Sequence, residues 1–335
     1  MTSSIKPIKQ RQYIAVASIA LMALCLALSS ASCTRKPAGG GSGGGKIVVG
    51  FSQMESNGPW RIAETNSMKE EARKRGDKFE LVVTDAQGQT SKQVSDVEDL
   101  IARRVKAIFL APREFEGLAP AIQAAKRAGI PVFLIDREAA GKPGEDYVTF
   151  IGSNFVEEGQ RAGEWLVKQT NGKASIVELT GSAGSSVAND RSKGFKDAIK
   201  DHPDMKIIAS QDGDFNRALA QKTMQNIIQS LGKQITVVYA HNDEMALGAI
   251  QALKDAGMNP GKDVLVVSVD GEKAALQAIG QGVMNVSVEC NPRFGPIAFD
   301  TLEKHLNGEK VPTKIIVPDR FFDQTNAQQF VNEAY

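Results

Sequence analysis

The residues of this sequence that could do chemistry are polar and aromatic side chains that come soon after short apolar runs. Carboxylates, amides and guanidinium groups can share paired hydrogen bonds with neighbouring hydroxyls, and aromatic faces can cover the C–H face of a ring. This mixture is typical of a site for a small polyhydroxylated ligand such as a sugar. In chain order the candidates are Trp60, Arg61, Asp136, Arg137, Arg191, Phe215, Asn242, Asp270 and Glu289.

Any one of these candidates has a simpler explanation, because Asp and Asn after a strand often cap the next helix or form a turn. We expect Asn154 and Asp243 to be such caps. The recurrence of candidates at equivalent places in both halves of the chain favours a shared binding site. Arg113 follows another apolar run, and it either reaches the ligand or lies at the rim of the site.

The sequence lacks the usual catalytic and metal-binding patterns. Its three histidines are His202, His241 and His305, and no two of them have the spacing of metal ligands. The segment GSAGSS, from Gly181, is not followed by GK[ST] and contains no G-x-S-x-G pattern. We therefore predict a binding protein without enzymatic activity, metal or cofactor, and we place this segment on a loop at the rim.

The overall composition limits the class of protein. The 40 Lys and Arg nearly balance the 39 Asp and Glu, whereas a protein that grips phosphate backbones usually has a basic excess. We therefore expect no nucleic-acid partner. A hydrophobic content of 42% and a charged content of 24% are typical of a soluble globular protein. A length of 335 residues is enough for two domains, each with its own core.

The N-terminus has the order of a secretory signal, which we assign to residues 1–32. Lys6, Lys9 and Arg11 precede an apolar run over 13–28, and small residues follow in LSSASC. A transmembrane anchor is the alternative, but a run of about 16 residues is shorter than the roughly 20 that span a bilayer. We therefore expect export to the periplasm or to the outer face of the cell membrane.

Cys33 follows Ser-Ala-Ser, which resembles the lipobox of bacterial lipoproteins, in which the cysteine becomes the lipidated first residue. Ser30 departs from the Leu or Val usual at that position, and plain cleavage at the same place would leave Cys33 unmodified. The Gly/Ser-rich segment 33–45 favours lipidation, because a flexible tether suits an anchored protein. Cys290 is then the one other cysteine of the mature chain, so we expect no disulfide.

From Lys46 onward, short β-branched apolar runs alternate with helix-length amphipathic stretches. This alternation predicts an α/β fold with parallel sheets buried on both faces. AIFLAPRE and PVFLIDRE in the first half parallel VVYAHNDE and VLVVSVDGE in the second. The sequence thus predicts two doubly wound lobes of similar plan. Ligands of such sheets bind beyond the carboxyl ends of the strands, where the candidates are expected to lie.

The motifs GFSQ, WRIAET, IFLAP, IPVFLIDR, DRSKGF, SQDGDFNR, VVYAHNDEMALGAIQALK and SVDG support a closer assignment. Together they resemble the type I periplasmic binding proteins of sugar ABC transporters, in the ribose- and galactose-binding group. Within that group the chain is most similar to galactofuranose-binding proteins. The resemblance implies two lobes joined by three hinge crossovers, with 46–150 plus 290–313 forming one lobe and 151–289 plus 314–335 the other.

The resemblance also implies roles for the candidates. Trp60 and Phe215 would sandwich the sugar ring, and the other seven candidates would hydrogen-bond its hydroxyls. Glu289 stands where ribose-type proteins have glutamine, which argues against plain ribose. The implied function is delivery of a galactofuranose-like sugar to a transporter permease by a monomer. A sensory protein that signals to a chemoreceptor or a sensor kinase is the alternative. A transcriptional repressor of this fold would need an N-terminal helix-turn-helix in place of the signal segment.

Overall fold

The computed structural model describes residues 45–335, so the expected signal segment, Cys33 and nearly all of the tether lie outside the described residues. Within this range, no helix combines the length and the apolar character needed to cross a membrane.

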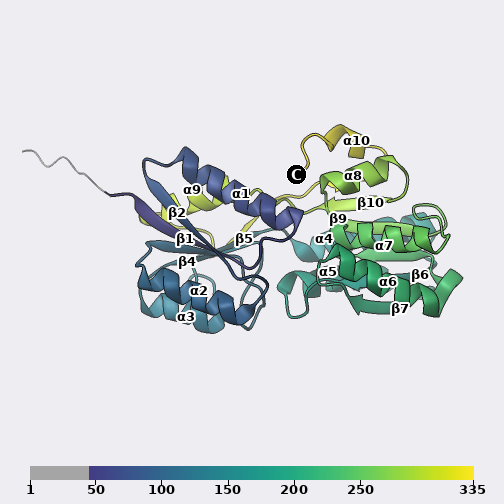
Figure 1. The fold of residues 1–335 in the computed structure, drawn as a ribbon, viewed down its shortest axis with the longest axis horizontal. Helices are drawn as coiled ribbons and strands as arrows, with labels where there is room; N and C mark the ends of the chain where they lie inside the picture. Colours follow the sequence, from purple (N-terminus) through teal and green to yellow (C-terminus); the bar gives the residue numbers. More distant parts are fainter. Residues whose placement is uncertain (1–44) are drawn as a thin grey trace, which may run out of the picture. The chain divides into compact units, whose positions relative to one another are not determined.

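The first sheet has the strand order β11-β5-β4-β3-β1-β2, and all of its pairs are parallel. We call this sheet and its helices the first lobe. Figure 1 shows α1 and α9 on one face of the sheet and α2 and α3 on the other. The elements are β1 (Ile47–Gln53), α1 (Pro59–Lys74), β2 (Phe79–Asp85), α2 (Thr90–Ala102), β3 (Ala107–Leu110), α3 (Ala119–Arg127), β4 (Val132–Ile135), β5 (Thr149–Gly152), α9 (Gly295–Leu306) and β11 (Lys314–Ile316).

The second sheet has the order β12-β10-β9-β8-β6-β7, parallel except for the edge strand β12. This sheet and its helices form the second lobe, in which α4 packs against α5 and α6 against α7. The elements are α4 (Phe155–Thr170), β6 (Ala174–Thr180), α5 (Ser186–Ile199), β7 (Met205–Asp212), α6 (Arg217–Leu231), the 3-10 turn η1 (Gly232–Gln234), β8 (Val237–Ala240), α7 (Asp243–Asp255), β9 (Leu265–Asp270), α8 (Lys273–Gly280), β10 (Val286–Glu289), β12 (Phe321–Phe322) and α10 (Ala327–Phe330).

Five inner strands of the two sheets are buried along their whole length. Every residue of β3, β4, β5, β8 and β10 is buried, because helices cover both faces of a parallel sheet. This is why the sequence shows continuous apolar runs there instead of an alternating pattern. The predicted α/β class with two doubly wound lobes is confirmed.

The chain passes between the lobes after β5, after β10 and after β11. The expected boundaries after 150 and after 313 need correction, because β5 stays in the first sheet to Gly152 and β11 joins it through Ile316. The sequence pattern locates an apolar run but does not say which of two similar sheets it joins. This is hardest for β11, a three-residue strand that is largely exposed.

Candidate functional site

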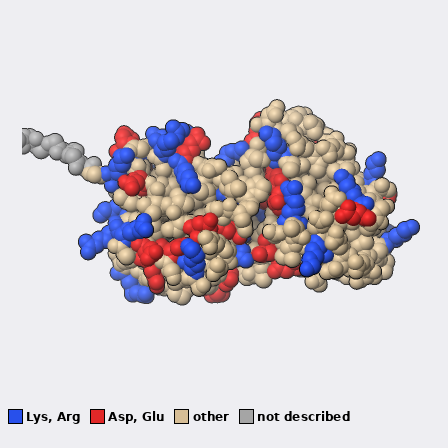
Figure 2. Space-filling view, in the orientation of Figure 1, with Lys and Arg blue, Asp and Glu red and all other residues tan. Residues whose placement is uncertain are grey.

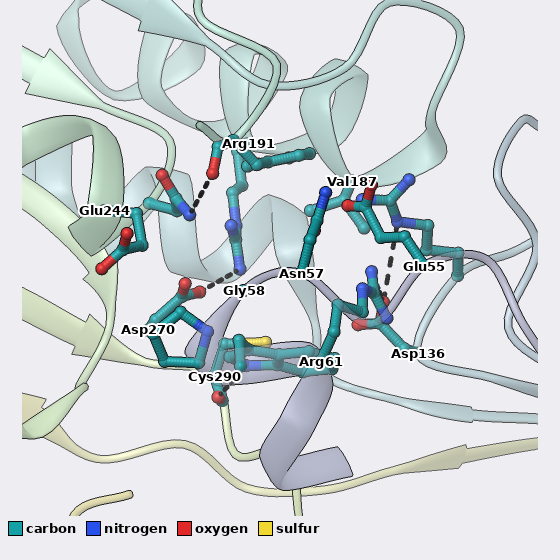
Figure 3. Close-up of a pocket in the computed structure, with 15 residues that line it drawn as sticks. Glu55, Asn57, Gly58, Arg61, Asp136, Val187, Arg191, Glu244, Asp270 and Cys290 are labelled. Carbon is teal, nitrogen blue, oxygen red and sulfur yellow. Dashed lines mark hydrogen bonds and ion pairs between the residues drawn. The ribbon is translucent and has the colours of Figure 1, made fainter. Parts of the chain in front are cut away.

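A pocket with about 500 Å³ of empty space, part of it open to solvent, lies between the lobes. The pocket is at the carboxyl ends of the strands, as expected for doubly wound sheets. Figure 3 shows its residues arriving from both lobes. The sequence-predicted residues that line it are Trp60, Arg61, Asp136, Arg137, Arg191, Phe215, Asn242 and Asp270.

In the first lobe, Arg61 is held between two carboxylates. Its Nη2 donates to Oδ2 of Asp136 at 2.7 Å, and its Nη1 donates to Oε2 of Glu64 at 2.9 Å. Glu64 is one turn further along α1, so these two groups meet on one helix face. Burial alone would lower the pKa of Arg61, but the two carboxylates outweigh burial and raise it. Burial raises the pKa of Glu64 to about 7, although Arg61 opposes this shift.

Trp60 is positioned by the start of α1 and by the hinge. Pro59 occupies the first turn of the helix, where its missing N–H costs nothing and its fixed φ suits the helix. The indole Nε1 donates to the carbonyl of Cys290 at 2.8 Å, and the Arg61 guanidinium lies 4.5 Å from the ring centroid. The ring that lines the pocket is therefore oriented by a crossover segment and by a cation–π contact.

In the second lobe, Arg191 has a similar environment. Its Nε donates to Oε2 of Glu158 at 2.7 Å, its Nη2 to Oδ1 of Asp270 at 3.3 Å, and its Nη1 to the carbonyl of His241. Figure 3 shows Arg191 reaching Asp270 across the pocket from Arg61 and Asp136. Burial raises the pKa of both Glu158 and Asp270, against the opposing effect of Arg191.

The Arg191–Glu158 pair depends on a close approach of α4 and α5. A Cβ on Gly159 would lie 2.1 Å from the carbonyl oxygen of Arg191, and one on Gly194 would lie 1.9 Å from that of Val156. Backbones this close leave no room for any side chain at these two positions. The glycines thus let two neighbouring helices bring Arg191 and Glu158 together.

Arg137 differs from the other two arginines because it is not matched by close carboxylates. Its Nη1 donates to the carbonyl of Arg113 at 3.0 Å, and its nearest carboxylate oxygen, on Asp136, is 3.6 Å away. Its buried Nε has no hydrogen-bond partner among the described residues. Burial, followed by repulsion from Arg61, lowers the pKa of Arg137 to about 9. A buried donor without a partner is available to a ligand acceptor.

Phe215 supplies the aromatic face on the second lobe. Its ring lies directly over Gly181, where a Cβ would come within 1.9 Å of it, and the Arg137 guanidinium is 5.2 Å from its centroid. Asn242 donates its Nδ2 to the carbonyl of Phe215 at 3.4 Å and caps α7 by accepting from the amide of Met245 at 3.0 Å.

The helix caps differ in part from expectation. Asn154 caps α4, as predicted, and accepts from the amide of Glu157. The predicted cap at Asp243 is wrong, because Asn242 takes that position in α7. Asp243 is instead fully buried and accepts from the hydroxyls of Ser268 and Ser287. Its carboxylate therefore fastens α7 to β9 and β10.

Three pocket residues that are not glycine have a positive φ, namely Asp136 at 64°, Phe215 at 54° and Asp270 at 131°. Such conformations cost energy in L residues and persist only where the surroundings impose them, often at functional sites. No feature of the sequence indicates this strain.

Glu289 is not among the residues that line the pocket. Its Oε1 accepts from Nη2 of Arg320 at 2.7 Å, and its Oε2 accepts from Nε and from the backbone amide of Arg320, both at 2.9 Å. Both carboxylate oxygens are thus already engaged in holding the third crossover. The pocket therefore does not support the predicted hydrogen bond from Glu289 to the ligand, nor the argument against ribose that depends on it.

Several lining residues were missed by sequence reasoning. Most are near neighbours of predicted ones in the chain: Glu244 and Cys290 are within two residues of Asn242 and Glu289, and four others precede Trp60, three on the loop and Pro59 at the start of α1. A loop has no periodic pattern that could have indicated which of its side chains turn inward. The missed residues are Glu55, Asn57, Gly58, Pro59, Val187, Glu244 and Cys290.

The sequence matches the periplasmic binding protein domain over residues 49–310. The chain belongs to this family. It is 46% identical to the galactofuranose-binding protein YtfQ of Escherichia coli over 80% of this chain and 85% of that protein. It is 34% identical to the ribose import binding protein RbsB of Bacillus subtilis over 82% of this chain and 86% of that protein. The resemblance inferred from the motifs is therefore confirmed.

Solved structures support the same assignment. The crystal structure of a galactofuranose binding protein superposes with a TM-score of 0.83 at 43% identity, covering 86% of this chain and 98% of that one. The binding protein of the arabinose ABC transporter from Shewanella sp. ANA-3, bound to L-arabinofuranose, gives 0.82 at 39%, covering 85% and 95%. The chain thus has the type I periplasmic binding protein fold.

Proposed function

We propose that this protein captures a neutral, galactofuranose-like monosaccharide between its lobes and delivers it to an ABC transporter permease. The observation that carries the proposal is the pairing of charges in the pocket. Arg61 and Arg191 are each already engaged by two carboxylates, so neither presents an uncompensated positive charge to a ligand. Three arginines and four carboxylates line the pocket, which disfavours an anionic ligand.

The proposed contacts follow from the free groups. Trp60 and Phe215 would cover the two faces of the sugar ring, and the unpaired Nε of Arg137 would donate to a ring or hydroxyl oxygen. Asp136 and Asp270 would accept from hydroxyls while remaining bound to their arginines. A ligand that contacts both lobes favours the closed arrangement by the difference of its affinities for the closed and open forms.

A melting-temperature screen of the full-length protein tests this proposal. We expect D-galactose, L-arabinose or D-fucose solutions, which contain furanose forms, to raise the melting temperature. D-galacturonate, which carries a carboxylate, should raise it less than D-galactose does. If no sugar stabilised the protein while an amino acid or a nucleoside did, the proposed ligand class would be wrong.

A substitution tests the site itself. Arg137→Met should abolish sugar binding in calorimetry and change the melting temperature little, because the buried Nε has no partner in the protein and the one hydrogen bond lost is that from Nη1 to the carbonyl of Arg113. Retained affinity would show that the sugar binds elsewhere.

Export and lipid anchoring at Cys33 form a separate part of the proposal, supported by the signal-like order of residues 1–32. Cells grown with labelled palmitate should yield labelled protein, and Cys33→Ala should remove both the label and the membrane association. Unlabelled protein in both cases would indicate plain cleavage.

A further inference from the structure

Arg113 lies beside the pocket and joins the first lobe to the second. Its Nη2 donates to Oδ1 of Asp214 at 3.1 Å, and its Nη1 donates to Oγ of Ser182 at 3.3 Å. The Arg113 side chain is 16% exposed and that of Asp214 is 42% exposed, so solvent and salt reach the pair mainly from the Asp214 side. Arg113 is not one of the residues that line the pocket.

The main chain of Arg113 is fixed within the first lobe. Its amide donates to Oε1 of Gln93, a buried residue of α2, at 2.8 Å. Its carbonyl accepts from Nη1 of Arg137, the arginine whose Nε is left free. Arg113 therefore also helps to orient a pocket residue of its own lobe.

The partner of Arg113 precedes the aromatic residue of the opposite lobe. Asp214 and Phe215 both have left-handed backbones, with φ of 49° and 54°. This turn directs the Asp214 carboxylate to Arg113 and the Phe215 ring to the pocket. The side chain of Arg113 thus binds the segment that carries Phe215. Its carbonyl accepts a hydrogen bond from Arg137, whose guanidinium lies over the Phe215 ring.

A main-chain contact between the lobes lies next to this ion pair. The amide of Phe115 donates to the carbonyl of Gly184 at 3.0 Å, within the Gly/Ser-rich rim loop. This hydrogen bond and the Arg113 contacts require the lobes to be together, because each joins a residue of one lobe to a residue of the other. They stabilise the closed arrangement and contribute nothing once the lobes separate.

We propose that Arg113 is a positioning residue that latches the lobes together and slows the release of the bound ligand. The proposal rests on the proposed function in one respect, namely that the ligand lies between the lobes. Because the latch forms only on closing, its loss should raise the dissociation rate constant and leave the association rate constant nearly unchanged.

The test compares Arg113→Gln, Asp214→Asn and the double variant with the unmodified full-length protein. Asparagine is chosen at position 214 because it tolerates a left-handed backbone. Arg75→Gln is the matched control, since Arg75 is similarly shielded but pairs with Glu71, Asp300 and Glu303 within the first lobe. Stopped-flow tryptophan fluorescence follows L-arabinose or D-galactose, because Trp60 lies in the pocket.

We expect each single variant to release the sugar faster by about 1.5-fold to fivefold, the range for partly exposed ion pairs. The double variant should be no faster than Arg113→Gln alone, because that substitution already removes the ion pair that Asp214→Asn removes. Arg75→Gln should keep the original dissociation rate even if its melting temperature falls. The proposed latch would be wrong if the single variants released the sugar at the original rate. It would also be wrong if the rate increase in the double variant equalled the product of the increases in the two single variants.

A second measurement needs no ligand. Without sugar, hydrogen exchange at the Phe115 amide should be faster in Arg113→Gln and Asp214→Asn than in the unmodified protein, and unchanged in Arg75→Gln. If no sugar binds the unmodified protein, the proposed function is wrong. The exchange rate at the Phe115 amide still tests whether Arg113 holds the lobes together. Equal exchange in all four proteins would then overturn the latch.

Discussion

Each lobe holds a buried arginine at the pocket, but the surroundings of the two arginines differ. In the first lobe the carboxylates around Arg61 have further polar neighbours: Gln53 donates to Glu64 at 2.8 Å, and the Arg137 guanidinium lies 3.6 Å from Asp136 without a hydrogen bond to it. In the second lobe, Asp270 is held by Arg191 alone among the described side chains. The first cluster thus has a second donor and a second cation beside it, whereas the carboxylates of the second cluster depend on Arg191.

The second cluster also depends on contacts from more segments of the chain. Arg61 is bound by Glu64 of its own helix and by Asp136 after β4. Arg191 is bound by Glu158 of α4, by His241 after β8 and by Asp270 at the end of β9. A buried charge is costly unless its partners are already in place. We infer that disturbing the packing of the second lobe should damage the site more than an equal disturbance of the first.

The largest effect is expected from removing the central arginine of the second cluster. Arg191→Met leaves two buried carboxylates without their cation, and such a loss costs about 3 to 5 kcal/mol of unfolding free energy. Arg61→Met should cost less, because Gln53 and Arg137 remain beside the two carboxylates. Urea unfolding of both variants measures the difference, and equal losses would remove the contrast between the clusters.

A smaller effect is expected from the glycines of the helix contacts. Gly194→Ala forces α5 away from α4 and should cost about 1 to 3 kcal/mol of unfolding free energy, as overpacking does, and it should also weaken sugar binding. The control is Gly295→Ala in the first lobe, where a Cβ would lie 2.2 Å from the carbonyl of Ser67. It should lower stability without lowering affinity, since this contact is not part of the pocket.

The pH dependence of stability should show the titration of Glu64. Its pKa is raised from 4.5 to about 7 in the folded protein, so the folded state binds more protons than the unfolded state between these values. The stabilisation from this proton is complete below about pH 4.5 and is lost as the pH rises through about 7. As the pH rises from about 4.5 to about 7, the melting temperature of Glu64→Gln should therefore rise relative to that of the unmodified protein. A constant difference would contradict the prediction.

The smallest effect on binding is expected at Glu289, which faces Arg320 and not the pocket. Glu289→Gln should change sugar affinity less than about twofold, while the lost ion pair should cost about 1 kcal/mol of unfolding free energy or less, given a partly exposed partner. Calorimetry measures the first and urea unfolding the second. A tenfold change in affinity would mean that Glu289 reaches the ligand after all.

Much of the fold and eight of the nine candidate residues could be predicted, because buried parallel strands leave continuous apolar runs and ligands bind where those strands end. Loop residues such as Asn57 and Glu55 could not, since no period marks the inward side of a loop. Glu289 was mistaken for a pocket residue because it ends a strand like the others, and only its neighbour on another segment, Arg320, decides what its carboxylate contacts.

The sequence by itself determined the α/β class, the two lobes of similar plan and the family, because these depend on local patterns and on motifs. The tertiary structure alone decided which charges meet. It placed Glu64 and Glu158 behind the arginines, left Nε of Arg137 without a partner and brought Arg113 to Asp214. Such pairings depend on distances between segments that are far apart in the chain, and a linear pattern of residue types carries no information about those distances.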